Sequence, residues 1–104
     1  MEQVNKNIAV SGKGRNNSPL ARYRIYLQLE KSLSHNTLDA YMSDVQKFET
    51  FLKDAGKGLL DASIEDFRSF LALLNDVGIL PRSQARILSS LRSLYGFLRL
   101  DGFL

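Results

Sequence analysis

The chain has 104 residues, with 14 Lys and Arg against 11 Asp and Glu, one His, no Cys and no Trp. This length suits one compact domain. The lack of Cys excludes disulfide scaffolds, thiolate zinc sites and cysteine nucleophiles, and a single His excludes His-pair metal sites. A hydrophobic content of 44% is sufficient for a core. We therefore expect a globular domain that needs no metal and no cofactor.

Residues 1–18 are polar and rich in Asn, Lys, Gly and Ser. They contain no apolar run long enough for a signal peptide or a membrane-spanning helix. The composition predicts a flexible, disordered N-terminal arm, which is either native or derived in part from a tag. We expect a cytoplasmic protein that does not interact with membranes.

Two helices are predicted in the first half of the remaining chain. The first covers Leu20–Lys31 and opens at Pro19, with Ile25 and Leu29 as further candidates for its apolar side. The second covers Asn36–Ala55, and Gly56 ends it. At 100° per residue its apolar residues fall on one side. These are Leu38, Tyr41, Val45, Phe48, Phe51 and Leu52.

Two further helices follow. The third begins at Ser63, whose side chain can cap it, and ends at Gly78; Asp66 is a weaker capping-box partner than Glu or Gln. The fourth covers Arg82–Leu100. No segment shows the alternation of a strand, so no sheet is predicted. The expected fold is all-α: a small four-helix orthogonal bundle over residues 19–104.

The charges are unevenly distributed. Residues 61–77 contain four acids and one Arg, whereas residues 81–104 contain four Arg and one acid. On the fourth helix, two of these arginines share a face with two serines, opposite the apolar side. We call this the arginine–serine face: Arg82, Arg86, Ser89 and Ser93. Guanidinium groups bind phosphate in bidentate fashion and small hydroxyls allow close approach, but the pattern is equally compatible with a solvated face.

The start of the second helix is another candidate site. It gathers Lys31, Ser34, His35, Asn36, Thr37 and Tyr41. A helix N-terminus with polar side chains and a nearby Lys can bind an anion. The alternative is ordinary capping, with the Tyr41 ring in the core; Thr37 falls on the same apolar side of the helical wheel.

Three segments together resemble a known family. The first is Asn36–Asp44 with Phe48 and Phe51-Leu52, the second is Ile64–Leu71, and the third is Ser83–Leu98. In this order and spacing they resemble the N-terminal, SAM-like core-binding domain of Xer-type tyrosine recombinases and phage integrases. The resemblance covers residues 19–104.

The resemblance implies that the domain binds double-stranded DNA at a core recombination site and positions it for a catalytic domain. By the motif match it assigns DNA contacts to Thr37, Tyr41, Arg86, Ser89 and Ser90. Lys31, Asn36, Arg82, Ser83 and Ser93 are added as neighbours from the helical wheel and the charge pattern. The family also implies other recombinase protomers as partners; we expect the isolated domain to be monomeric.

The family's catalytic residues have no match here. Its Tyr nucleophile lies among Arg, Lys and His residues, whereas this chain has one His and four Tyr that lie on predicted bundle helices. We therefore expect a non-catalytic piece of a longer recombinase, with the catalytic domain absent. The alternatives are a helical protein–protein interaction domain without DNA binding, a stand-alone enzyme, and a helix-turn-helix regulator.

Overall fold

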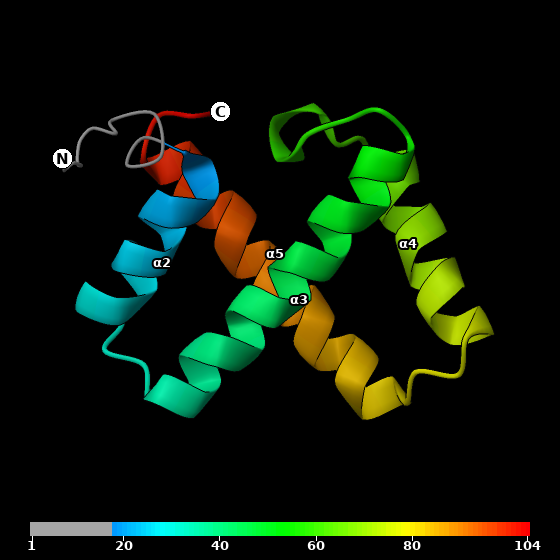
Figure 1. The fold of residues 1–104 in the computed structure, drawn as a ribbon, viewed down its shortest axis with the longest axis horizontal. Coiled ribbons are helices and arrows are strands. Elements are labelled where there is room, and N and C mark those ends of the chain that lie inside the picture. The colour runs from blue at the N-terminus through cyan, green and yellow to red at the C-terminus, as the bar shows by residue number, and fades with distance from the viewer. Residues whose placement is uncertain (1–17) are drawn as a thin grey trace, which may run out of the picture. The chain divides into compact units, whose positions relative to one another are not determined.

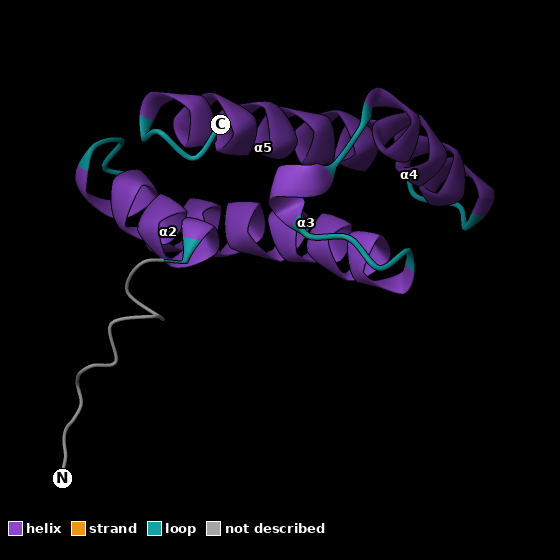
Figure 2. Cartoon of the chain, turned by 90° about the horizontal axis from the view of Figure 1, so that it is seen from above, coloured by secondary structure: helices purple, strands orange, loops and turns teal. Residues whose placement is uncertain are grey.

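The computed structural model describes residues 18–104, so the predicted arm lies outside the described residues except for Ser18. The described part contains the α-helices α2 (Pro19–Leu29), α3 (His35–Asp54), α4 (Ile64–Asp76) and α5 (Pro81–Leu100), with a 3-10 helix, η1 (Leu59–Asp61). Residues 18–104 contain no strand, which confirms the all-α class (Figures 1 and 2). The chain divides into two compact units at Ser34 and His35, which we describe separately.

The described residues of the first unit, 18–34, contain α2. The Ser18 hydroxyl accepts a hydrogen bond from the Ala21 N–H at 3.1 Å, and Pro19 occupies the first helical turn. Both features favour a helix start. Tyr23 is buried, but Ile25 and Leu29 are 51% and 70% exposed. The expectation that these two residues extend the apolar side was wrong, because they lie on other faces of the helix than Tyr23.

The second unit, residues 35–104, is built around two long helices that cross near their middles (Figure 1). α3 and α5 lie in separate layers (Figure 2), and α4 packs on both. Both helices end close to the predicted residues. α4 also stops as predicted, because Gly78 adopts a φ of 86°, which is unfavourable for residues with a Cβ.

A cluster of aromatic rings joins the three α-helices of this unit. The Phe48 ring of α3 is fully enclosed. Its centroid lies 4.7 Å from that of Phe67 and 5.0 Å from that of Phe70, both on α4. Tyr95 of α5 meets Phe67 edge to face at 5.3 Å. Offset and edge-to-face contacts of this kind stabilise a core beyond the area that they bury.

The start of α4 is fixed by a reciprocal capping box. The Ser63 hydroxyl accepts from the Asp66 N–H at 3.2 Å, and the Asp66 carboxylate accepts from the Ser63 N–H at 2.8 Å. Lys57 Nζ lies 2.7 Å from the same carboxylate. Asp therefore completes the box despite its short side chain, with a cation as additional partner. The hydrogen bond from Lys57 and those from Ser63 lower the pKa of Asp66 from its ordinary value of 3.8.

This lowered pKa predicts a pH-dependent contribution to stability. Because the folded state favours the charged carboxylate, the contribution is present above the unfolded pKa and is lost as the pH falls through the lowered folded value. We expect Asp66→Asn to unfold with a shallower pH dependence below about pH 4 than the parent chain. Urea unfolding at several acidic pH values measures this. Parallel curves for the two proteins would contradict it.

No helix of residues 18–104 is both long and apolar enough to span a bilayer.

Candidate nucleic-acid interface

The arginine–serine face lies along one side of α5. Arg82 and Ser89 are exposed, and Ser93 is half-buried, as is the adjoining Ser83. These side chains recur at the helical period on a helix whose opposite side is buried in the core. The face thus presents exposed arginine and serine side chains along one side of α5.

Arg86, on the same face, is bound to an acid that the sequence pattern did not place there. Its Nε donates to Asp44 Oδ2 at 3.0 Å, and its Nη2 donates to Asp44 Oδ1 at 2.9 Å. Asp44 lies on α3 and is fully buried, whereas the Arg86 side chain is 47% exposed. The hydrogen bonds that Arg86 donates to Asp44, and the negative charge of that carboxylate, raise the pKa of Arg86. An acid of the neighbouring helix α3 thus pairs with one of the two arginines of this face.

Ser90 lies beneath this pair. It is fully buried, and its hydroxyl donates to Asp44 Oδ2 at 2.8 Å and lies 3.1 Å from the Arg86 carbonyl oxygen. The structure thus gives this residue a place in the core between α3 and α5. A DNA partner could not reach the Ser90 hydroxyl without separating the two helices, so we remove this residue from the candidate surface.

The start of α3 supplies the second candidate surface in this unit. Asn36 and Thr37 are exposed, and Tyr41 is half-buried. Thr37 is thus exposed although it falls on the apolar side of the helical wheel. His35 Nε2 lies 3.3 Å from Asp39 Oδ2 in an exposed pair one turn apart. α3 and α5 both begin toward the lower edge of Figure 1, on opposite sides of the view.

Lys31 belongs to the first unit. It follows α2 and is exposed, and its ammonium nitrogen lies 5.8 Å from the centroid of the Tyr26 ring. This is within the range of a cation–π contact.

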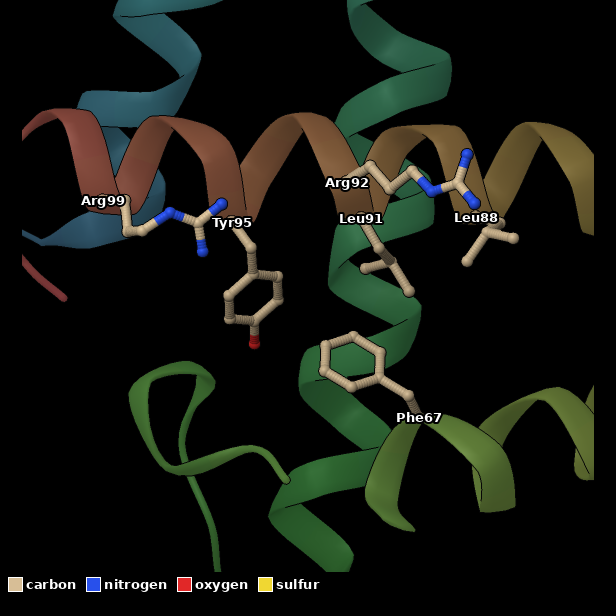
Figure 3. Close-up of a pocket in the computed structure, with 6 residues that line it drawn as sticks. All are labelled: Phe67, Leu88, Leu91, Arg92, Tyr95 and Arg99. Atoms are coloured by element: carbon tan, nitrogen blue, oxygen red, sulfur yellow. The ribbon is translucent and has the colours of Figure 1, made fainter. Parts of the chain in front are cut away.

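The other flank of α5 carries an apolar groove that faces α4 (Figure 3). Its volume is about 330 Å³, and it is lined by Phe67, Leu88, Leu91, Arg92, Tyr95 and Arg99. The Tyr95 hydroxyl donates to the Leu59 carbonyl at 2.6 Å, and burial raises the pKa of this phenol. At 100° per residue, Arg92 and Arg99 lie more than 100° around α5 from Arg86. They therefore provide charge-matched controls on the same helix.

None of the described residues forms a group of three or more potential metal ligands.

Comparison with known proteins decides the family. A model of the phage integrase N-terminal SAM-like domain matches residues 20–102. The chain belongs to this family. The resemblance identified from the motifs is thus confirmed, and with it the SAM-like fold.

Several curated relatives of this SAM-like domain are tyrosine recombinases. The chain is 42% identical to tyrosine recombinase XerD of Rhizobium meliloti over 76 residues, which is 73% of this chain and 24% of the relative. It is 40% identical to XerC of Lacticaseibacillus casei over 87 residues, or 80% of this chain and 29% of the relative. It is 39% identical to XerC of Bacillus subtilis over 74 residues, which is 70% of this chain and 24% of the relative. No solved structure matches. The chain thus spans about a quarter of the length of these relatives.

Proposed function

We propose that this SAM-like domain binds double-stranded DNA and positions a core recombination site for a catalytic domain elsewhere in the same protein. The proposed contacts come from the arginine–serine face with Ser83, and from Asn36, Thr37 and Tyr41. Lys31 is proposed as a further phosphate contact. The observation that carries the proposal is Arg86, a half-exposed guanidinium held in a fixed orientation on a face with an exposed second arginine.

The proposed contacts suit the DNA backbone better than base edges. Arginine binds phosphate oxygens in a planar, two-pronged geometry, and hydroxyls and amides add shorter hydrogen bonds that fix the position of the protein on the duplex. With three cationic contacts, from Arg82, Arg86 and Lys31, the logarithm of the affinity should fall with a slope of about −2.7 against the logarithm of the salt concentration. An isolated module of this kind is expected to bind in the micromolar range.

The relatives' name supports a role for the whole protein in breaking and rejoining DNA. That activity needs catalytic residues outside this chain, so we assign this domain no catalytic step. The partners that we propose are the DNA core site and further recombinase protomers assembled on it. We propose the bacterial cytoplasm, at the nucleoid, as the place of action.

A backbone-amide NMR titration with a short duplex at low salt tests the DNA interface. We expect shifts at residues 31–41 and 82–93 that fade between about 50 and 200 mM salt, because counterion release drives phosphate binding. Arg82→Gln should weaken binding, whereas Arg99→Gln, the same charge change on the other flank of α5, should have a smaller effect. Shifts confined to the groove residues outside these two ranges, Phe67, Tyr95 and Arg99, or no shifts, would favour a protein–protein interaction domain instead.

A further inference from the structure

Asp44 is the only acid in residues 18–104 that is fully enclosed by protein. It is also the residue that links α3 to the arginine–serine face of α5. Its two carboxylate oxygens accept three hydrogen bonds from α5, at 3.0, 2.9 and 2.8 Å, two from Arg86 and one from Ser90. Lys47 Nζ is farther away, at 3.9 Å. A buried carboxylate with this many short bonds has little freedom to move.

The geometry leaves part of the Arg86 guanidinium available. This group has five N–H donors in one plane, and Asp44 receives hydrogen bonds from two of its nitrogens, Nε and Nη2. Nη1 and the second Nη2 hydrogen point away from that carboxylate because the group is planar. The side chain is 47% exposed, so the guanidinium is bound on one edge and open to solvent around the rest.

We propose that Asp44 is a positioning residue for DNA binding: it holds Arg86 so that the open edge of the guanidinium meets a backbone phosphate. The proposal rests on the proposed DNA-binding function. An arginine that is already ordered loses little side-chain freedom when it binds, whereas an arginine free in solvent loses much of it. Asp44 itself does not touch DNA.

This role predicts that removal of the Asp44 charge changes the affinity for DNA in the direction opposite to the one that charge alone predicts. A negative charge next to Arg86 lowers the positive potential that attracts DNA, so removal of the Asp44 charge should strengthen binding if only charge mattered. Loss of orientation should weaken binding instead. The amide of Asn can accept only on one side and would direct its own N–H donors at the guanidinium.

The first experiment compares Asp44→Asn with Asp39→Asn, measured by fluorescence anisotropy with a short labelled duplex of mixed sequence at low salt. Asp39 is an exposed acid on the same helix, and its carboxylate pairs with His35 one turn away. We expect Asp44→Asn to weaken binding about fivefold to tenfold and Asp39→Asn to leave it equal or tighter. Tighter binding by Asp44→Asn would overturn the proposal.

A double-mutant cycle then shows whether Asp44 acts through Arg86. Arg86→Lys keeps the positive charge but loses the planar fork, so it should weaken binding by a similar factor. Asp44→Asn should then add less than twofold in the Arg86→Lys background. If each change instead weakens DNA binding by the same factor in both backgrounds, the result would contradict the positioning role.

Unfolding curves of each variant separate a loss of fold from a loss of orientation. Should Asp44→Asn fail to fold, Ser90→Ala takes its place, because it removes the hydroxyl that bonds Asp44 and the Arg86 carbonyl oxygen without any change of charge. We then expect Ser90→Ala to weaken binding about twofold and Arg86→Lys to do so about fivefold. Parent affinity for both variants would refute the proposal.

The two proposals fail in different ways. If the parent chain shows no salt-dependent binding to the duplex, the DNA-binding function itself is wrong. If the parent binds and Arg82→Gln weakens binding, but Asp44→Asn and Arg86→Lys bind as the parent does, then the function stands and the positioning role of Asp44 is refuted.

Discussion

Phe48→Ala is expected to lower the free energy of unfolding by about 4 kcal/mol, which is within the range for a fully buried aromatic residue. Phe48 is fully enclosed and stacks near Phe67, Phe70 and Tyr95. Its removal loses the transfer free energy of the ring and leaves a cavity where α3, α4 and α5 meet. Because all three helices border this space, no single side chain can refill it.

Urea unfolding followed by circular dichroism measures this change. Phe51→Ala is the matched control, because its ring belongs to the same cluster, 5.3 Å from that of Phe70, but is only half-buried. We expect it to cost about half as much, near 2 kcal/mol. Equal effects of the two substitutions would contradict the central place of Phe48 in the core.

Arg86→Met is expected to cost about 3 kcal/mol of stability. The substitution keeps an unbranched side chain, although a shorter one, and leaves the buried Asp44 carboxylate with Ser90 as its close partner and Lys47 at 3.9 Å. An enclosed charge without its cation is far more costly than the loss of a surface ion pair, because water cannot replace the missing hydrogen bonds.

Two further variants test this explanation by thermal or urea unfolding. Arg82→Met removes the same charge from the same helix at an exposed position, so its effect should stay within about 0.5 kcal/mol. Adding Asp44→Leu to Arg86→Met should recover much of the lost stability, since the unpaired charge is then gone. A double variant as unstable as Arg86→Met alone would show that the buried charge is not the cause.

The helices and their ends could be predicted from the sequence because their signals are local. Ser63, Gly78 and Pro81 each act within a turn of their own position, through a cap, a positive φ or a fixed φ. The apolar residues of α3 and α5 recur at the helical period. The capping box at Asp66 was expected to be weak, and its strength depends on Lys57, nine residues away, which no local rule could include.

The Asp44–Arg86–Ser90 network could not be predicted in the same way. Its members are 42 and 46 residues apart, and their contact depends on how α3 and α5 cross. One signal was present in the sequence, however. On the helical wheel Asp44 falls within the apolar side of its helix, and an acid at such a position indicates a buried ion pair. The same contact moves Ser90 from the predicted DNA surface into the core.

The exposed residues of the first helix illustrate a second limit. Ile25 and Leu29 were candidates for its apolar side because of their residue type alone. Single exposed aliphatic residues are common on protein surfaces, so hydrophobicity without the right spacing is a poor guide to burial. The three-residue helix η1 was also missed, since it is too short to show a periodicity.

The bond between Asp44 and Arg86 also has a consequence for the order of events during synthesis. The acid leaves the ribosome 42 residues before its cation, which at usual elongation rates is an interval of roughly 2 to 8 s. During that time Arg86 and Ser90, the partners of the carboxylate on α5, are not yet available to it. The oriented guanidinium is thus a property of the finished fold, and a chain still being translated exposes Asp44 before it carries the charges of Arg82 and Arg86.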